Sequence, residues 1–163
     1  MNTAVIPAHL PERRTFMGAA GDELQALVYR PPVAAPCGVG PPVILDLHGG
    51  AWTYFSPAVD VAHCRALADA GYVVVAVSFR SALQAPWPGF FDDQRCALAW
   101  VRDHATDLGG DPGRIVVMGG STGGHAALLL GLRGDASGRT PEAVVALWPV
   151  ADVPGRYEMV RRA

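Results

Sequence analysis

The stretch that most constrains the fold runs from Arg114 to Leu130, where a short β-branched run, four glycines around one serine and an apolar helical run follow one another. Ile115 to Met118 is typical of a buried strand, and the residues after Gly124 are typical of a helix. A strand that turns sharply into a helix needs glycine beside the turn, because larger side chains would hold the two elements apart. The pattern therefore predicts strand, sharp turn and helix, with Ser121 at the turn.

The turn itself has the spacing of a nucleophile elbow, Gly119-x-Ser121-x-Gly123, which holds a serine hydroxyl above the end of a sheet. The backbone N–H of Thr122, at the start of the helix, would face a developing oxyanion. The alternative is a glycine-rich turn that binds phosphate. A P-loop requires lysine, whereas all 13 Lys and Arg residues of this chain are arginine, and a dinucleotide fingerprint has glycine where Ser121 stands. The elbow is the favoured interpretation.

Composition limits the remaining possibilities. A chain of 163 residues with 50% apolar and 17% charged residues is long enough for one globular domain. A net charge of −2 gives no electrostatic reason to expect nucleic acid or a membrane surface as a partner. The three widely spaced cysteines, Cys37, Cys64 and Cys96, form neither a disulfide framework nor a metal cluster, which favours a reducing cytoplasm. We expect no signal peptide and no membrane span.

The rest of the chain alternates strands and helices. Hydrophobic patterns and turn residues predict strands at 24–29, 43–47, 72–77, 115–118 and 143–147, and helices at 58–70, 92–108 and from the turn to about 133. Strands separated by helices predict a doubly wound, mostly parallel sheet. Residues 1–21 are expected to form an N-terminal arm on the surface, residues 30–42 a stiff proline-rich loop, and residues 22–163 part of a single domain.

A second motif, His48-Gly49-Gly50-Ala51-Trp52, directly follows the expected strand at 43–47. Ligands of open α/β sheets bind at the carboxyl ends of the strands, and glycine lets backbone N–H groups face a ligand without obstruction. The motif is weak by itself. Together with a nucleophile elbow it gains weight, because an oxyanion hole takes one donor from each of the two places.

With both motifs, the chain resembles the α/β-hydrolase fold, and within it the carboxylesterases similar to hormone-sensitive lipase and the bacterial feruloyl-esterase-like group. The resemblance begins at about residue 22 and ends in Leu147-Trp148-Pro149-Val150-Ala151-Asp152. The other matching residues are His48 to Trp52, Phe79-Arg80, Pro86-Trp87-Pro88, Asp92-Asp93, Asp111 to Ile115 and Gly119 to Gly124. Two departures are Ala51, where a third glycine is frequent, and Thr122, where alanine is frequent. Neither removes a backbone donor.

The resemblance implies a serine hydrolase of small acyl esters that needs neither cofactor nor metal; aryl formamides are an alternative substrate class. It implies Ser121 as the nucleophile and the N–H groups of Gly49, Gly50 and Thr122 as oxyanion donors. The residues expected to support this site are His48, Trp52, Gly119, Gly123 and His125. His48 as the catalytic base is a less favoured alternative, since the resemblance makes it a loop-orienting residue. His63 and His104 are expected to be structural or solvated, and His9 lies on the arm.

The catalytic triad is incomplete in this sequence. In the α/β-hydrolase fold the triad residues follow in the order serine, acid, histidine, and His125 is the only histidine after Ser121. The candidate acids are Asp135, Glu142, Asp152 and Glu158. Asp152 is the best placed, but we expect it to cap a helix that starts near Pro154. The chain therefore stops where the C-terminal strands of this fold would supply the acid and the base.

Two hypotheses of different class remain. The first is a serine esterase whose acid and histidine are not in this chain, and the second is a non-catalytic hydrolase-fold module that binds a small acyl ligand or a partner protein. The expected strand at 143–147 is wholly apolar, and such a strand at a sheet edge would promote aggregation. We therefore expect a second polypeptide or self-association to cover it.

Overall fold

The computed structural model describes residues 10–32, 40–53 and 56–162, which form a six-stranded sheet in the order β1-β2-β4-β3-β5-β6. The strands are β1 (Glu12–Met17), β2 (Glu23–Tyr29), β3 (Val43–Leu47), β4 (Val73–Val77), β5 (Ile115–Gly120) and β6 (Ala143–Leu147). The pairs β3–β4, β3–β5 and β5–β6 are parallel, whereas β1–β2 and β2–β4 are antiparallel. The prediction of a mostly parallel sheet is confirmed.

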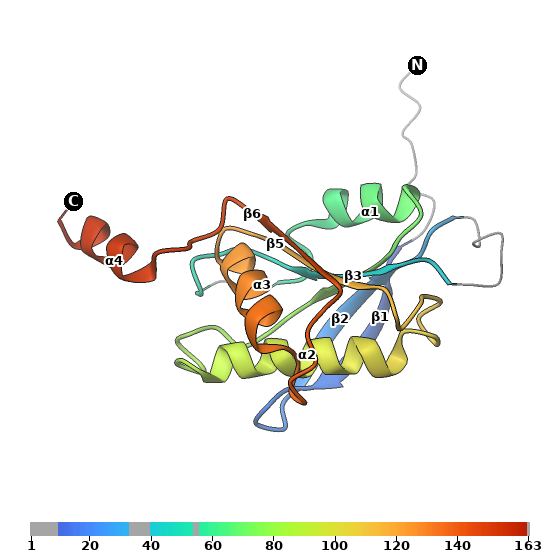
Figure 1. Cartoon of the computed structure of the whole chain (residues 1–163), viewed down its shortest axis with the longest axis horizontal. Helices are drawn as coiled ribbons and strands as arrows, with labels where there is room; N and C mark the ends of the chain where they lie inside the picture. Colours follow the sequence, from blue (N-terminus) through green and yellow to red (C-terminus); the bar gives the residue numbers. More distant parts are fainter. Residues whose placement is uncertain (1–9, 33–39, 54–55, 163) are drawn as a thin grey trace, which may run out of the picture.

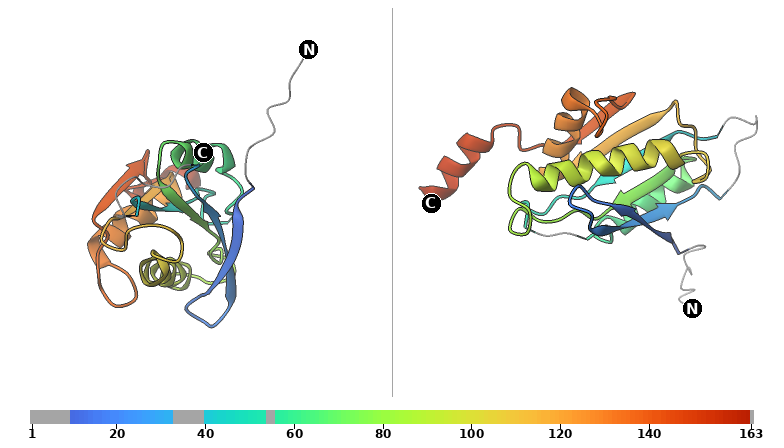
Figure 2. Two further views of the ribbon diagram at one scale, coloured as in Figure 1. Left: turned by 90° about the vertical axis from the view of Figure 1, so that its right-hand side faces the viewer. Right: turned by 90° about the horizontal axis from the view of Figure 1, so that it is seen from below.

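Helices cover both faces of this sheet (Figure 1). Helix α1 (Val61–Asp69) lies on one face, and α2 (Gly89–His104) and α3 (Thr122–Arg133) lie on the other, as the views in Figure 2 also show. The fourth helix, α4 (Val153–Arg161), projects away from the sheet and has no buried residue. The layers α1, sheet and α2–α3 are those of a doubly wound fold.

The two faces of β3 show how side-chain alternation divides the core. Val43, Leu45 and Leu47 point into the larger apolar cluster on the α2–α3 side, and Ile44 points into the smaller cluster under α1. Because successive side chains of a strand alternate between faces, Asp46 belongs to the α1 face. A single carboxylate therefore enters an otherwise apolar, fully buried strand.

The expectation of an N-terminal arm is wrong for Glu12–Met17, which forms the edge strand β1 against β2. In β1 only Phe16 is buried, and the charged residues before it hide the alternation that would have indicated a strand. Charged side chains are typical of edge strands, where they oppose edge-to-edge aggregation. His9 and Cys37 lie outside the described residues.

Some helix boundaries differ from the predicted ones: α1 and α2 each start three residues away, and α2 ends four residues early, whereas α1 ends within one residue of the prediction and α3 ends at Arg133 as predicted. Helix α2 starts at Gly89, directly after Pro88 at its N-cap, since proline is tolerated where a helix begins. It ends at His104, and the chain then turns toward Gly109, whose φ is +88°. Helix α1 begins at Val61 instead of residue 58.

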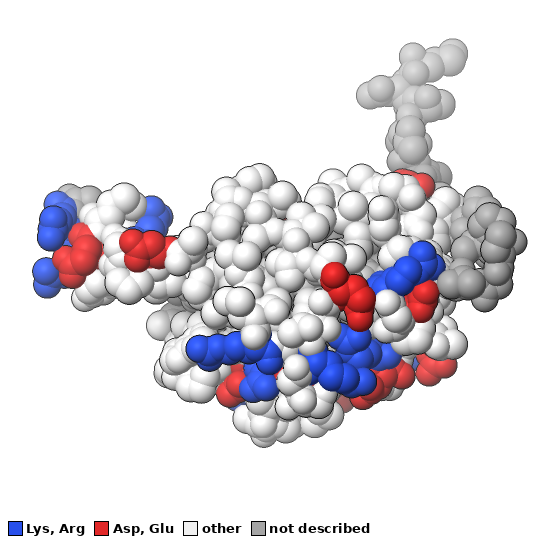
Figure 3. Space-filling view, viewed as in Figure 1, with Lys and Arg blue, Asp and Glu red and all other residues white. Residues whose placement is uncertain are grey.

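Charged side chains are unevenly distributed over the surface. In the view of Figure 3 they gather on α4 and on the part of the molecule around α2, whereas the surface between these two parts is largely uncharged. Helix α3 carries one basic residue in its last turn, Arg133. In the part of the chain that the structure describes, no helix combines the length and the apolar character needed to cross a bilayer.

Candidate active site

Ser121 lies at the junction of β5 and α3 in a strained backbone conformation, with φ 55° and ψ −120°. Its backbone is fixed on both sides, because its N–H donates to the carbonyl of Leu147 at 3.0 Å and its carbonyl accepts from the N–H of His125 at 3.0 Å. The side chain does not cap α3. Among the described residues its hydroxyl has no hydrogen-bond partner, so it stands free at the carboxyl end of the sheet.

Glycine is required around this turn because β3, β5 and α3 meet there without room for side chains. A Cβ atom on Gly119 would lie 2.7 Å from the carbonyl oxygen of Leu47, and one on Gly123 would overlap the carbonyls of Leu47 and His48. Real Cβ contacts are longer than this. The glycines therefore hold Ser121 beside the loop that follows β3.

Three backbone N–H groups near Ser121 are without acceptors among the described residues. Gly49 lies directly against the turn, since a Cβ on Gly49 would stand 3.3 Å from the Cβ of Ser121 and 3.1 Å from the carbonyl oxygen of Gly120. Within residues 10–32, 40–53 and 56–162, the N–H groups of Gly49, Gly50 and Thr122 donate to no acceptor. The N–H of Thr122 also belongs to the first turn of α3, where helical N–H groups have no intrahelical partner.

The loop after β3 keeps its shape through left-handed backbone at three successive residues. Gly50, Ala51 and Trp52 have φ values of 134°, 51° and 61°. The loop is tied by a hydrogen bond from the N–H of Thr53 to the carbonyl of Gly50 (3.0 Å) and by one from the N–H of Ala82 to that of Trp52 (2.7 Å). Left-handed backbone costs free energy at a residue with a side chain. This explains why a glycine would fit at the position of Ala51.

His48 is buried and both of its ring nitrogens are engaged. Its ring stacks on Phe79 at 4.5 Å, its Nδ1 lies 2.7 Å from the carbonyl oxygen of Gly49, and the N–H of Ser56 donates to its Nε2 at 3.2 Å. An accepting Nε2 requires the neutral ring with its proton on Nδ1. Burial lowers the pKa of His48, which is consistent with a neutral ring. Because both ring nitrogens are engaged, neither can accept the proton of Ser121. The contacts favour a role for His48 in orienting the loop that follows β3.

His125 does not reach the hydroxyl of Ser121 through any hydrogen bond among the described residues. Its Nδ1 lies 2.8 Å from the carbonyl oxygen of Val150, and its ring meets the ring of Trp52 edge-on, with the centroids 6.0 Å apart. His125 thus joins the loop after β3 to the segment after β6.

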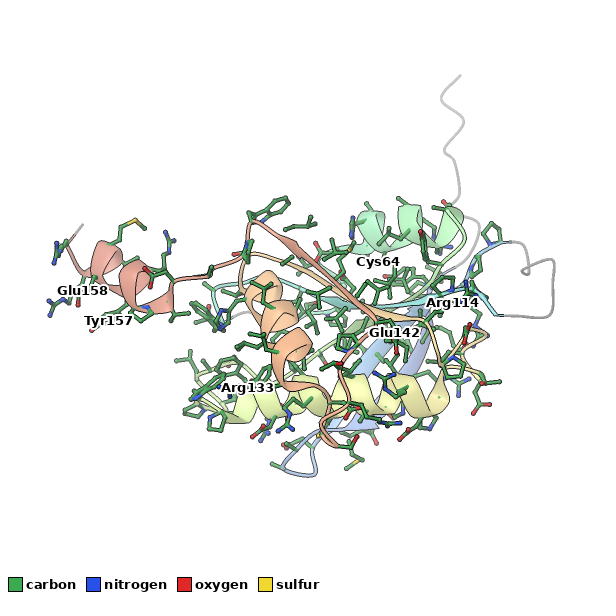
Figure 4. The ribbon with its side chains drawn as sticks, viewed as in Figure 1. Cys64, Arg114, Arg133, Glu142, Tyr157 and Glu158 are labelled. Atoms are coloured by element: carbon green, nitrogen blue, oxygen red, sulfur yellow. The ribbon has the colours of Figure 1, made fainter. Side chains whose placement is uncertain are left out.

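The candidate acids after Ser121 are all engaged elsewhere. Asp135 is fully buried and accepts from Ser137 and Arg139, and Glu142 accepts from the N–H of Ile115 at 2.8 Å. Asp152 caps α4 by accepting from the N–H of Gly155 at 2.9 Å, which confirms its predicted capping role. Figure 4 shows Glu158 on α4, away from the sheet. None of the four supplies an acid beside Ser121.

A cavity of about 560 Å³ opens at Ser121. It is lined by Asp46, Gly49, Gly50, Ser56, Val59, Asp60, His63, Met118, Gly119, Gly120, Ser121, Leu147 and Trp148. Of the predicted site residues, the cavity brings together Ser121, Gly49, Gly50 and Gly119. The others, Thr122, His48, Trp52, Gly123 and His125, are not among the lining residues.

The sequence analysis did not find the acidic and aromatic part of the cavity wall, Asp46, Asp60 and Trp148. The one available signal was a carboxylate inside an apolar strand, two residues before His48. Burial raises the pKa of Asp46 to about 6, and the thiol of Cys64 lies 3.5 Å from its Oδ2. Within the described residues, no group of three or more His, Cys, Asp or Glu side chains is arranged to hold a metal ion.

Comparison with known proteins links this geometry to esterases. Residues 28–146 match the family model BD-FAE. The chain is 34% identical over 148 residues to the carboxylesterase NlhH of Mycobacterium tuberculosis and 36% identical over 145 residues to the ethyl acetate hydrolase of Pseudomonas putida. Both alignments cover 87% of this chain and 45% of the relative, so the chain spans about half the length of these proteins.

Solved structures give the same result. A bacterial heroin esterase superimposes with a TM-score of 0.74 at 30% identity, over 85% of this chain and 44% of that one. A hyperthermophilic esterase from the archaeon Pyrobaculum calidifontis gives a TM-score of 0.73 at 32% identity, over 86% of this chain and 45% of that one. The sheet and its helices are therefore those of the α/β-hydrolase fold.

Proposed function

Because this chain belongs to the BD-FAE family, among the α/β-hydrolase carboxylesterases similar to hormone-sensitive lipase, we propose that it provides the nucleophile and the oxyanion hole of an enzyme that hydrolyses small carboxylic esters. One observation carries the proposal. The hydroxyl of Ser121 stands on a strained turn beside three backbone N–H groups, those of Gly49, Gly50 and Thr122, that donate to no acceptor among the described residues.

In the proposed reaction the Oγ of Ser121 attacks the ester carbonyl carbon, and the proton of the hydroxyl passes to a base. The negative charge that develops on the carbonyl oxygen would be stabilised by the N–H of Thr122 and by that of Gly49 or Gly50. The base then gives this proton to the leaving alkoxide, which departs as the alcohol, and water hydrolyses the acyl-enzyme to release the acid and restore the serine hydroxyl. Since the donors are backbone groups, the departures at Ala51 and Thr122 leave this stabilisation in place.

The base and the acid are the parts that the described residues do not supply. Both ring nitrogens of His48 and the Nδ1 of His125 are engaged elsewhere, and among the described residues no histidine is hydrogen-bonded to Ser121. The candidate acids form caps or ion pairs. We therefore propose that a second polypeptide, or a second copy of the chain, covers the free edge of β6. Of the described strands, β6 pairs with β5 alone, and its side chains are only partly buried. A covering chain that carries histidine and a carboxylate would complete the triad.

The test is hydrolysis of p-nitrophenyl acetate by the purified chain, with and without added imidazole as an external base. After the rate of imidazole in buffer is subtracted, we expect slow turnover that imidazole accelerates and that Ser121→Ala reduces by about 100-fold, the lower end of the range for loss of a catalytic group. Thr140→Ala removes a hydroxyl from an exposed loop residue and serves as the matched control. Equal rates for Ser121→Ala and the unchanged chain would refute Ser121 as the nucleophile.

A second candidate function, binding without turnover, is favoured by the hydrogen bonds that hold His48 and the Nδ1 of His125 away from Ser121. In that case the chain would bind an acyl ligand in the cavity, and imidazole would hydrolyse the substrate no faster with the chain present than in buffer alone, since imidazole itself attacks p-nitrophenyl acetate. The same assay therefore separates the two functions. Adding an aryl formamide to the substrates tests the alternative substrate class.

A further inference from the structure

The wall of the cavity opposite the loop glycines combines negative charge with an aromatic surface. Asp46 comes from β3, Asp60 from the N-cap of α1, and Trp148 from the residue after β6. Apolar side chains of Val59, Met118 and Leu147 complete this wall. Among the described residues the lining contains no arginine, and its one basic group is the exposed imidazole of His63, whose Nε2 lies 3.1 Å from the sulfur of Met118.

Asp46 is the group that needs explaining, because its side chain is 4% exposed and yet faces the cavity. Its Oδ2 lies 3.5 Å from the thiol of Cys64, a weak donor, and its Oδ1 accepts no hydrogen bond from the described residues. No arginine pairs with it in the part of the chain that the structure describes. Figure 4 shows Cys64 on α1, turned toward the sheet. A buried carboxylate that lacks a cation is costly unless a ligand supplies the charge.

Asp60 adds a second carboxylate at the mouth of the same cavity. It is half-buried and stands at the N-cap of α1, but its side chain makes no capping hydrogen bond. Among the described residues it forms no ion pair either. Two carboxylates on one low-dielectric wall make the cavity attractive to a positively charged ligand.

The apolar part of the wall determines which kind of cation fits. The six-membered ring of Trp148 passes over Gly120, within 3.5 Å of where a Cβ on that residue would stand. Trp148 is also 75% exposed and has a strained φ of 37°, so local packing does not account for its position. Indole faces bind alkylammonium groups through cation–π attraction. A metal ion would need a compact set of ligands, which the described residues do not offer.

We propose that this wall is a subsite for an organic ammonium group, so that the preferred substrates of Ser121 are esters carrying a positively charged alkylammonium group. The role of the subsite in substrate choice rests on the proposed esterase function, whereas binding of the cation does not. The carboxylates of Asp46 and Asp60 would face the positive charge of the ammonium group. The indole of Trp148 would contact its alkyl groups. The cavity would thereby discriminate between charged and uncharged esters of the same shape.

The test is a backbone-amide NMR titration of the full chain with choline and with 3,3-dimethylbutan-1-ol, which replaces the charged nitrogen of choline by carbon. We expect choline to bind about tenfold more tightly than the neutral alcohol, as a cation–π contact and two carboxylates predict, and to shift the amides around Ser121. Asp60→Asn should remove most of this preference without changing the affinity for the alcohol. Trp148→Leu should weaken choline binding at an exposed position that the fold does not depend on.

Two control variants show whether a change in choline binding comes from the proposed subsite. Asp69→Asn, at an exposed carboxylate at the other end of α1, should leave choline binding unchanged. Ser121→Ala should also bind choline normally, so that failure of the nucleophile and failure of the subsite are separate results. Equal affinity for choline and the alcohol, or amide shifts confined to a surface outside the cavity, would overturn the proposal.

Discussion

The two faces of the sheet differ in how their buried carboxylates are paired. On the α2–α3 face, Asp93 is fully buried and receives two hydrogen bonds of 2.8 Å from the guanidinium of Arg80. On the α1 face, Asp46 is almost as buried, but the one hydrogen bond that its carboxylate accepts from the described residues comes from the thiol of Cys64. The first carboxylate holds loops and helices together, whereas the second faces the cavity at Ser121.

Asp135, which also lies on the α2–α3 face, differs from Asp46 in the direction of its pKa shift. Although burial opposes its ionisation, hydrogen bonds from Ser137 and Arg139 hold its pKa below the ordinary value. For Asp46 burial prevails, and the pKa rises to about 6. A protein keeps an unfavourable buried charge chiefly where function needs it. The comparison therefore separates structural carboxylates from a functional one.

The largest effect is expected for Asp93→Asn, which removes the charge that faces Arg80. Breaking one partner of a buried ion pair leaves the other uncompensated, so the free energy of unfolding should fall by about 3 kcal/mol. Urea unfolding followed by circular dichroism at pH 7.5 measures this. As a control, Asp103→Asn disrupts an exposed ion pair with Arg139, and the same measurement should change by less than about 0.5 kcal/mol. Equal effects for the two variants would contradict the structural role of Asp93.

A smaller effect of opposite sign is expected for the same substitution on the other face, Asp46→Asn. The pKa of this carboxyl is about 6 in the folded chain and 3.8 ordinarily. Between these values the folded state holds a proton that the unfolded state has released, so stability is lost as the pH rises through 6. The amide removes this loss, and the difference between the two pKa values corresponds to at most about 3 kcal/mol. Burial of the polar amide offsets part of this gain, so the variant should be more stable by about 2 kcal/mol at pH 7.5.

The pH dependence distinguishes this cause from a general improvement in packing. The gain from Asp46→Asn should shrink below pH 6 and disappear near pH 4, where the carboxyl is protonated in both states. Urea unfolding at pH 4, 6 and 7.5 provides the measurement. If the variant were destabilised at pH 7.5, Asp46 would be a structural carboxylate like Asp93, and the contrast between the two faces would be lost.

Most of the sheet could be predicted from the sequence because its buried strands are continuous apolar runs. The bounds of β3 and β6 agree with the predicted ranges, and Asp152 caps α4 as its position beside Pro154 indicated. The edge strand β1 could not be predicted in this way, since it buries only Phe16 and carries charges instead of an apolar pattern.

The candidate site likewise has a part that could be predicted from the sequence and a part that could not. Local motifs indicate the turn at Ser121 and the glycines after β3, because each depends on a few neighbouring residues. The acidic wall depends on three elements that meet only in the folded chain, β3 with Asp46, α1 with Asp60 and the end of β6 with Trp148. No local pattern contains that juxtaposition. The left-handed backbone of Trp52 and Trp148 was equally hidden, since neither is a residue type that favours it.

The central claim, that Ser121 is the nucleophile of this cavity, is tested most directly by a fluorophosphonate, which reacts when a serine oxygen attacks phosphorus and fluoride leaves. The chain would be incubated with the reagent and imidazole at pH 8, and the adduct located by intact mass and by the tryptic peptide 115–133. We expect one adduct per chain, carried by Ser121 and absent from Ser121→Ala. No adduct, or an adduct that persists in Ser121→Ala, would contradict the claim.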